Sequence, residues 1–240
     1  MFKQVRICLV GATGMVGSAL IAACVGRSEV KLVAVSRREA DLPKGARMEV
    51  LLAPVEGWGE AISAAQPDVL VIALGTTWHK AGRDEAAFRE VDEKLVLECA
   101  NWGKAAGAKH LIVVSSAGAD RGSKHLYQRV KGEVEAQVAK LGYPRLDVLR
   151  PGLLLGRRKE FRLLERLAQI FAPVLDLFLG GKYAAFRSIH VDVLAQAIIA
   201  LTQYKVRGRF GYEHDDILRA IRRQALEANV RRAVHGEPLE

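Results

Sequence analysis

The stretch of sequence that decides the fold is VRICLVGATGMVG, residues 5–17. Its first six residues favour a short apolar strand, and Gly11, Gly14 and Gly17 follow at intervals of three. Residues 18–26 favour a helix, and the apolar residues 30–35 favour a second strand. A strand, a glycine-rich turn, a helix and a second strand within about 30 residues have the size of a βαβ unit.

The same alternation continues along the chain. We expect further strands at 48–52, 69–74, 110–114 and 146–149, and helices at 59–65, 83–106 and 126–141. Strands that are apolar on both faces and alternate with helices need a parallel sheet that is covered on both sides. The sequence therefore predicts an α/β protein with a doubly wound, mainly parallel sheet, the Rossmann fold, with helices on both faces.

The pattern is less regular after Gly152. Helices are expected at 160–171, 191–204 and 215–234, and residues 172–181 receive no assignment. No internal repeat, low-complexity tract or linker divides the chain. We therefore predict a single domain over residues 1–240, in which residues 152–240 form a small, less regular portion on the substrate side.

The composition excludes several classes of protein. Half of the 240 residues are apolar, which rules out disorder for most of the length. Cys8, Cys24 and Cys99 lie in apolar stretches without C-x-x-C spacing, so we expect no disulfide framework and no metal site. Buried thiols in a reducing compartment predict a cytoplasmic location.

Membrane and signal segments are not expected either. There is no run of 18 apolar residues free of charge or proline, so no membrane span is expected. The glycines before Cys24 argue against a signal peptide.

The net charge is +9, from 36 basic and 27 acidic residues. Most of the excess lies in residues 150–240, which hold 16 basic and 10 acidic side chains. This distribution fits either a solvated basic surface or a surface for phosphates or nucleic acid, and composition alone favours the first. No aromatic-rich stacking surface accompanies the arginines, so we expect no nucleic-acid partner.

The glycine-rich turn has the spacing of a dinucleotide site. Without side chains, Gly11 and Gly14 let backbone amides approach a pyrophosphate, and Gly17 lets the helix pack on the strand. Thr13 could add a hydroxyl donor. The alternative is a purely structural turn, but the strand–turn–helix context favours dinucleotide binding.

The end of the second strand indicates which dinucleotide is bound. NAD sites carry an Asp or Glu about 20 residues after the turn, which binds the ribose hydroxyls. Here the sequence reads Ser36-Arg37-Arg38, and a guanidinium can pair with a 2′-phosphate. The alternative is a solvated basic turn. The sequence thus favours NADP(H), with NAD(H) as the second choice.

A Ser–Tyr–Lys constellation follows the strand at 110–114. Ser115 and Ser116 end this segment, and Tyr127 and Lys131 are spaced to share one helix face. The ammonium of Lys131 would favour the deprotonated form of Tyr127 and hold ribose hydroxyls, while Tyr127 exchanges a proton with a substrate oxygen. Such a pair alone is common in helices, as a half-exposed Tyr beside a solvated Lys.

Five blocks of sequence carry a family resemblance: GATGMVG (11–17), LGTTWHKAG (74–82), VSSAGAD (114–120), LYQRVKGEVE (126–135) and LRPGLLLGRR (149–158). On these blocks the chain resembles a short-chain dehydrogenase/reductase of the atypical, extended-like branch. More closely, it resembles the Tat-interacting-protein family of NADPH-binding oxidoreductase-like proteins. The blocks lie within residues 7–158, about two thirds of the chain.

The resemblance implies roles for individual residues. The pyrophosphate would lie against Gly11, Thr13, Gly14, Met15 and Val16, and a 2′-phosphate near Ser36, Arg37 and Arg38. Leu74, Gly75 and Thr76 would line the adenine and ribose side, and Pro151, Gly152 and Leu153 would border the nicotinamide. Tyr127 and Lys131 would be the catalytic pair, with Ser116 as the orienting hydroxyl and Ser115 in reserve. Many relatives place an Asp after the third strand, where this chain has Leu52-Ala53-Pro54, so that adenine contact is in doubt.

Candidate substrate contacts lie in the basic C-terminal third. Arg157 and Arg158 follow the last expected strand and could receive an anionic group, although the sequence slightly favours a solvated helix face. His190 and His79 are candidate substrate acids, but solvated histidines are more common. The apolar side of the helix at 215–234 is expected to pack on the body or on a second copy, which would make a homodimer.

These observations favour an NADP(H)-dependent oxidoreductase that moves a hydride between nicotinamide and a carbonyl or alcohol. Two other functions stay open because the same fold serves many roles. The first is a non-catalytic, NADPH-binding regulatory or redox-sensing protein that acts through a protein partner. The second is a sugar-nucleotide epimerase or dehydratase that recycles its cofactor in place. The sequence does not name the substrate.

Overall fold

A computed structural model describes residues 4–156 and 181–235. Its main sheet has seven strands in the order β3-β2-β1-β4-β5-β6-β9, and every neighbouring pair is parallel. The strands are β1 Val5–Val10, β2 Val30–Ser36, β3 Glu49–Leu52, β4 Val69–Ile72, β5 His110–Val114, β6 Arg145–Leu149 and β9 Gly208–Tyr212. A separate parallel pair is formed by β7 Leu154–Leu155 and β8 Ile189–His190.

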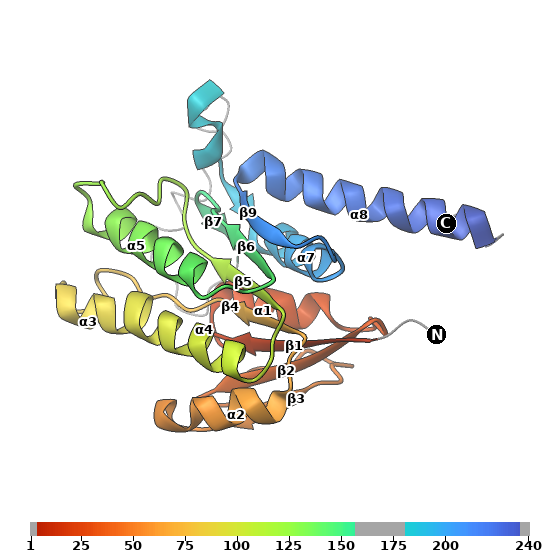
Figure 1. Cartoon of the computed structure of the whole chain (residues 1–240), viewed down its shortest axis with the longest axis horizontal. Helices are drawn as coiled ribbons and strands as arrows, with labels where there is room; N and C mark the ends of the chain where they lie inside the picture. Colours follow the sequence, from red (N-terminus) through yellow and green to blue (C-terminus); the bar gives the residue numbers. More distant parts are fainter. Residues whose placement is uncertain (1–3, 157–180, 236–240) are drawn as a thin grey trace.

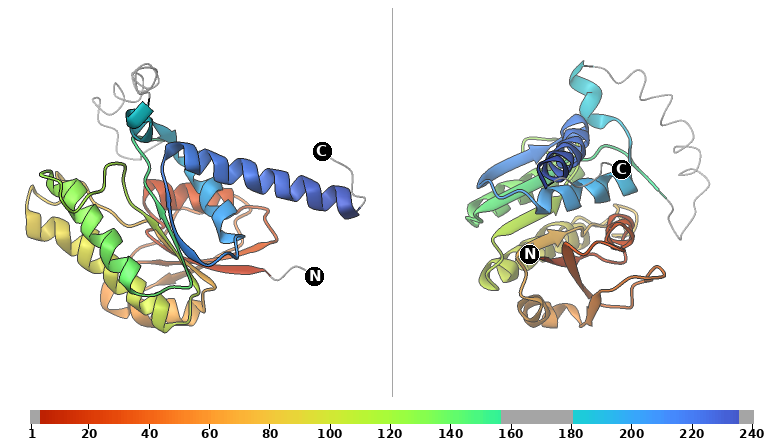
Figure 2. Two further views of the ribbon diagram at one scale, coloured as in Figure 1. Left: turned by 45° about the horizontal axis from the view of Figure 1, so that its top comes forward. Right: turned by 90° about the vertical axis from the view of Figure 1, so that its right-hand side faces the viewer.

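Helices cover both faces of the main sheet (Figures 1 and 2). One face carries α1 Met15–Ala23, α7 Val191–Thr202 and the first half of α8 His214–His235. The other carries α2 Trp58–Ala65, α3 Glu85–Arg89, α4 Val96–Ala105 and α5 Leu126–Lys140. The short turns η1 Val55–Gly57 and η3 Gly181–Phe186 complete the described elements, with η2 Glu90–Leu95 between α3 and α4. The predicted doubly wound Rossmann fold is confirmed.

The two cores follow from alternation along the central strands. On β1, Ile7 and Leu9 face α1 and α7, whereas Cys8 and Val10 face α2 and α4. Each large aliphatic side chain buried in this way contributes about 1.5–3 kcal/mol. The strand order reverses between β1 and β4, and ligands of doubly wound folds bind at the carboxyl ends of the strands beside this switch point.

Strand β9 was not predicted. Its sequence, GRFGY, contains two glycines and an arginine, and its residues alternate between half-buried and exposed because it is an edge strand. It pairs with β6 from Arg145↔Gly208 to Leu149↔Tyr212, so the region after residue 152 returns to the main sheet. The assignment of residues 152–240 to a less regular substrate-side portion of one domain stays a prediction.

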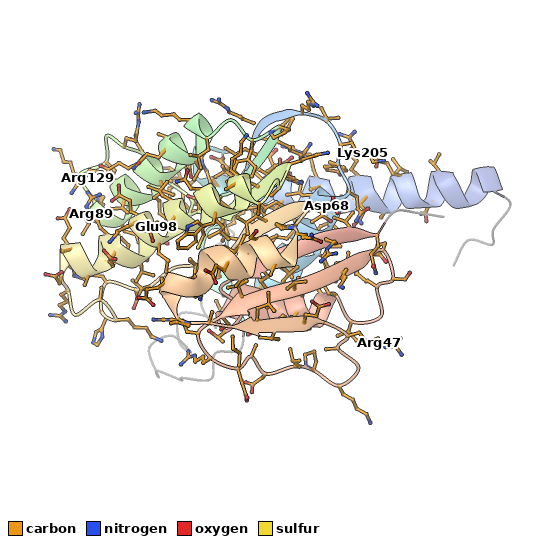
Figure 3. The ribbon with its side chains drawn as sticks, turned by 60° about the horizontal axis from the view of Figure 1, so that its bottom comes forward. Arg47, Asp68, Arg89, Glu98, Arg129 and Lys205 are labelled. Atoms are coloured by element: carbon orange, nitrogen blue, oxygen red, sulfur yellow. The ribbon has the colours of Figure 1, made fainter. Side chains whose placement is uncertain are left out.

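The helix predicted over 83–106 is interrupted. Asp84 caps α3 by accepting a hydrogen bond from the Ala87 amide (2.7 Å), which sets the start of the helix. Residues Glu90–Leu95 form a π-helical turn before α4 begins. Arg89, labelled in Figure 3, joins this segment to α5. It forms ion pairs with Glu93 and Glu133, each at 2.6 Å.

A buried charge cluster lies at the amino ends of β5 and β6. Asp147 is fully buried and accepts from Arg145 Nε (2.9 Å), and its carboxylate lies 2.8 Å from His110 Nε2. Arg145 also donates to the Val206 carbonyl (2.7 Å) and lies over the Phe210 ring at 4.5 Å. These contacts join β9 and the loop before it to the sheet.

The second half of α8 extends beyond the sheet (Figure 1). Ile217 and Ala220 are buried against the body, whereas Leu226 and Val230 are exposed. Packing of the first half on the body agrees with the expected amphipathic helix, and a homodimer through the second half stays a prediction. Within the described part of the chain, no helix combines the length and apolar character that a bilayer crossing requires.

Candidate active site

The glycine-rich turn lies where β1, β4 and α1 meet. Gly11 has φ +99°, and a Cβ there would lie 2.5 Å from the Ala73 carbonyl oxygen after β4. A Cβ at Gly17 would lie 2.2 Å from the Gly11 carbonyl oxygen. Both glycines are therefore needed for the fold itself. A Cβ at Gly14 would meet only the carbonyl oxygens of Gly11 at 3.3 Å and Ala73 at 3.8 Å, so Gly14 is needed less for packing.

The amino end of α1 is open. Gly14 is its N-cap residue, no described side chain caps the helix, and the first turn contains no acidic residue. An uncapped helix start offers free N–H groups and a partial positive charge, which together fit a pyrophosphate. Thr13 is exposed beside it, and Met15 is half-buried. Val16 is buried in the core, so only its backbone could contact a cofactor.

The residues predicted for the 2′-phosphate lie at the end of β2. Ser36 is buried, and its hydroxyl oxygen accepts from the Arg38 amide at 3.4 Å. The side chains of Arg37 and Arg38 are exposed. Since β2 neighbours β1, this turn and the glycine-rich turn share the carboxyl edge of the sheet. The structure thus leaves both arginine side chains exposed at the same edge of the sheet as the glycine-rich turn.

Lys131 is paired with a residue that sequence reasoning missed. Its Nζ lies 2.8 Å from Oδ1 of Asp92, and the two residues are 5% and 0% exposed. Oδ2 of Asp92 accepts from the Thr76 amide at 2.6 Å. A Cβ at Gly75 would lie 3.4 Å from Asp92 Oδ1 and 3.9 Å from Lys131 Nζ. Asp92 therefore joins α5 to the turn of Leu74, Gly75 and Thr76 after β4.

The π-helical turn places Asp92 in this position. In the sequence Asp92 lies among Glu90, Glu93 and Lys94, a charged run that reads as a solvated helix face. One surplus residue in a helical turn changes which side chains face inward, and such turns are frequent at functional sites. No local signal in the sequence could have paired Asp92 with a lysine on another helix.

Tyr127 stands at the surface above the buried pair. It is 42% exposed, its ring centroid is 5.9 Å from Lys131 Nζ, and its ring packs on the buried Phe88 at 5.9 Å between centroids. The tyrosine hydroxyl belongs to an accessible side chain, whereas the lysine beneath it is enclosed. This arrangement fits a proton-transferring tyrosine held beside a fixed cation.

The two serines after β5 differ in what they contact. Ser115 is buried and donates to Glu135 at 2.5 Å. Arg150 holds the same carboxylate, and the hydrogen bonds to Glu135 raise the pKa of the Arg150 guanidinium. Ser116 is half-buried, and among the described residues its hydroxyl donates one long bond, to the adjacent Ala117 carbonyl at 3.3 Å. The two serines therefore differ in how tightly their hydroxyls are held, and the assignment of Ser116 as the orienting hydroxyl stays a prediction.

The residues predicted around the nicotinamide follow β6. The Pro151 carbonyl accepts from the Ala117 amide at 2.8 Å, which joins the ends of β6 and β5. A Cβ at Gly152 would lie 2.3 Å from the Arg187 carbonyl oxygen, so this glycine admits the segment that follows η3. The side chain of Leu153 is 48% exposed.

The candidate substrate residues are not brought together with Tyr127 by any described contact. His190 is the N-cap residue of α7, and its Nδ1 lies 3.0 Å from the Asp192 carboxylate. This capping role accounts for the histidine without a ligand. His79 is exposed in the loop after β4. Arg157 and Arg158 lie outside the described residues.

Comparisons with known proteins agree with this geometry. A family model described as NAD(P)H-binding matches residues 11–142. Protein fmp52 from Aspergillus niger is 34% identical over 201 residues, covering 81% of this chain and 85% of that protein. Protein HTATIP2 from Rattus norvegicus is 41% identical over 178 residues, covering 72% of this chain and 73% of that protein. The expected resemblance to the Tat-interacting-protein family is confirmed.

Two solved structures show the same fold at low sequence identity. MoeE5 in complex with UDP-glucuronic acid and NAD has a TM-score of 0.65 at 15% identity, covering 86% of this chain and 75% of that one. The Bordetella bronchiseptica enzyme WbmH in complex with NAD+ has a TM-score of 0.67 at 14% identity, covering 88% of this chain and 76% of that one. At such identities the likeness supports the Rossmann fold and nothing finer.

The expectation of a cytoplasmic location is wrong. The Fmp52 relatives from Aspergillus niger, Emericella nidulans and Candida albicans are mitochondrial proteins by name. The thiols that suggested a reducing compartment are explained by packing. Burial raises the pKa of Cys8 to about 12 and that of Cys24 to about 11, and such protonated, enclosed thiols are not specific to one compartment.

The open start of α1 and the family match concern the same part of the molecule. The matched residues, 11–142, begin at the glycine-rich turn and include Asp92, Ser116, Tyr127 and Lys131. They make up more than half of the chain, and two relatives above 30% identity cover more than two thirds of it. The chain therefore belongs to the NAD(P)H-binding family, an oxidoreductase-like group of Rossmann-fold proteins whose members include Fmp52 and HTATIP2.

Proposed function

We propose that the protein is an NADP(H)-dependent oxidoreductase of the short-chain type, which interconverts a carbonyl compound and the corresponding alcohol. The observation that carries the proposal is the position of Tyr127, exposed above the buried Lys131–Asp92 pair. This pair is hydrogen-bonded to the turn after β4, at the carboxyl edge that also holds the open start of α1.

The chain's own residues would act as follows. Amides at the start of α1 bind the pyrophosphate, and Arg37 and Arg38 bind a 2′-phosphate. The nicotinamide supplies or accepts the hydride when it is bound. In reduction, Ser116 donates a hydrogen bond to the carbonyl oxygen, and Tyr127 gives its proton to that oxygen as the hydride reaches the carbon. Lys131 stabilises the tyrosinate, which regains a proton from solvent.

The test is NADPH oxidation with a panel of aldehydes and ketones. Tyr127→Phe should lower kcat by about 10²–10⁴, the usual contribution of a positioned general acid. NADPH affinity should stay within about twofold, because the hydroxyl is not needed to bind the cofactor. Tyr204→Phe removes a hydroxyl that donates to the Ala220 carbonyl on α8 at 3.1 Å, away from Tyr127, and should leave kcat unchanged. A panel in which no carbonyl consumes NADPH, although NADPH binds, would contradict the enzymatic proposal and favour the regulatory alternative.

The preference for NADP(H) is tested separately. Arg37→Ala removes a charged donor and should weaken NADPH binding about tenfold while leaving NADH binding unchanged. Arg47→Ala is a matched control and should leave the affinity for NADPH unchanged. Arg47 is an exposed arginine in the loop before β3, at the amino edge of the sheet (Figure 3). Equal affinity for NADH and NADPH in the unmodified protein would remove the proposed role of the two arginines.

A sugar-nucleotide reaction is the second candidate function. MoeE5, a protein of the same fold, has a structure with UDP-glucuronic acid and NAD bound. An epimerase would retain its cofactor through purification and would convert a nucleotide sugar without net NADPH consumption. Free exchange of cofactor and net consumption of NADPH would favour the carbonyl reductase instead.

A further inference from the structure

The region around Tyr127 gathers exposed apolar side chains. Ten large apolar residues in the described part of the chain are more than 40% exposed. Five of them lie on segments that follow the carboxyl ends of β4, β5 and β6 or on η3: Trp78, Tyr127, Leu153, Tyr183 and Phe186. Single exposed apolar residues are ordinary, whereas a group of them indicates a binding surface.

A row of three aromatic rings fixes one side of this region. Phe88 is 1% exposed and packs between its two neighbours. Its ring centroid lies 6.4 Å from that of Trp78, edge to face, and 5.9 Å from that of Tyr127. The buried ring therefore links Trp78, itself 43% exposed, to the proposed proton donor through two ring contacts.

Phe186 lies on the side of Ser116. A Cβ at Gly118, two residues after Ser116, would come within 3.1 Å of the Phe186 ring. A Cβ at Gly152 would lie 2.6 Å from the Phe186 carbonyl oxygen. Two glycines at the ends of β5 and β6 thus leave room for η3 to approach. Each proposed substrate-facing hydroxyl is thus connected to an exposed aromatic side chain through one intermediate residue. Phe88 lies between Tyr127 and Trp78, and Gly118 follows Ser116 and approaches Phe186.

We propose that the substrate is a carbonyl compound or alcohol with an apolar body, which packs between Trp78 and Phe186 while its oxygen meets Tyr127 and Ser116. This inference rests on the proposed function and specifies its substrate class. Small-molecule sites of this kind are lined mainly by apolar and aromatic groups, with a few polar groups that fix orientation.

Binding to the protein saturated with NADP+ tests the proposal without turnover, because the oxidised cofactor has no hydride to give to a ketone. Acetophenone and dihydroxyacetone share the ketone and differ in the polarity of the body. By calorimetry, acetophenone should bind at least about tenfold more tightly, with a negative heat-capacity change. Dihydroxyacetone or UDP-glucose binding as tightly as acetophenone would overturn the proposal.

Variants locate the binding surface. Trp78→Ala and Phe186→Ala should each weaken acetophenone binding about fivefold or more, since each removes an aromatic contact, while Trp78→Phe restores most of the affinity. Val206→Ala is the control, because Val206 is 63% exposed but lies in the loop before β9, at the opposite edge of the sheet. Melting temperatures confirm that each variant is folded. Unchanged affinity in both alanine variants would overturn the assignment.

The oxidoreductase function and the apolar substrate class can be contradicted separately. If acetophenone binds in a Trp78-dependent way but no carbonyl is reduced, the proposed oxidoreductase function fails and the apolar site stands. If a polar carbonyl is reduced with dependence on Tyr127 and acetophenone does not bind, the oxidoreductase function stands and the apolar substrate class is wrong.

Discussion

The two edges of the parallel sheet each contain a buried ion pair, Lys131 with Asp92 at the carboxyl edge and Arg145 with Asp147 at the amino edge. Both carboxylates are 0% exposed and both cations are 5% exposed. Arg145 is enclosed by further partners, including the Val206 carbonyl and the Tyr212 hydroxyl. The Lys131–Asp92 pair has other neighbours: Gly75 and the exposed Tyr127 lie beside Lys131, and the Thr76 amide donates to Asp92. A buried cation–carboxylate pair is thus enclosed by further structural contacts at the amino edge, whereas under the proposed function the pair at the carboxyl edge supports Tyr127.

The largest expected effect is on stability at the amino edge. Asp147→Ala leaves Arg145 buried without its carboxylate, so the free energy of unfolding should fall by about 3–5 kcal/mol. Urea denaturation measures this change. NADPH affinity, measured where the variant is folded, should be unaltered. A fall in the free energy of unfolding of less than about 1 kcal/mol would show that the Arg145–Asp147 pair contributes little to the fold.

At the carboxyl edge, Asp92→Asn should act on the reaction. The amide cannot satisfy both the Thr76 amide and Lys131, and losing a charged hydrogen bond costs about 1.5–3 kcal/mol, or about 10–100-fold in kcat. Without the carboxylate, Lys131 acts on Tyr127 uncompensated, so the pH profile for alcohol oxidation should move to lower pH. Asp92 would then be a positioning residue. A variant with a lower melting temperature but unchanged kcat and pH profile would make it purely structural.

A pH effect distinguishes the amino edge further. Burial lowers the pKa of His110 from its ordinary 6.5, more than Asp147 opposes this. The unfolded chain therefore binds a proton that the folded protein does not, and stability falls as the pH drops below about 6.5 towards the folded-state value. The expected loss is about 1 kcal/mol between pH 6.5 and 5.5, bounded by one proton. In His110→Gln, the free energy of unfolding should no longer fall between pH 6.5 and 5.5. If it falls as in the unmodified protein, other groups cause the pH dependence.

The smallest expected effect tests whether the carboxyl edge is open for a ligand. Gly14→Ala adds a methyl group at the start of α1 and should weaken NADPH binding about twofold to fivefold, in line with the roughly 0.3–1 kcal/mol of a helix-end interaction. Gly57→Ala is a matched control, since Gly57 is likewise an N-cap glycine, at the start of α2. If both variants bind NADPH as the unmodified protein does, the pyrophosphate lies elsewhere.

Local patterns explain what could be predicted from the sequence. The glycine turn and its flanking strand and helix are contiguous, and the apolar runs of the central strands are long enough to require burial on both faces. Strand β9 was missed because an edge strand with Gly208 and Gly211 lacks such a run. Asp92 was missed because its partner is 39 residues away in the sequence and the π-helical turn leaves no periodic signal. The distinction between Ser115 and Ser116 likewise depends on Glu135, a contact across 20 residues.

The surplus residue in Glu90–Leu95 sets a limit on how this protein can vary. Deleting one residue there would let α3 and α4 merge into a regular helix with better backbone hydrogen bonds. The same deletion would rotate every preceding side chain by about 100° relative to α4, because an α-helix has 3.6 residues per turn. Asp92 would then swing away from Lys131, so a shortened chain would gain local order and lose the anion beneath its tyrosine.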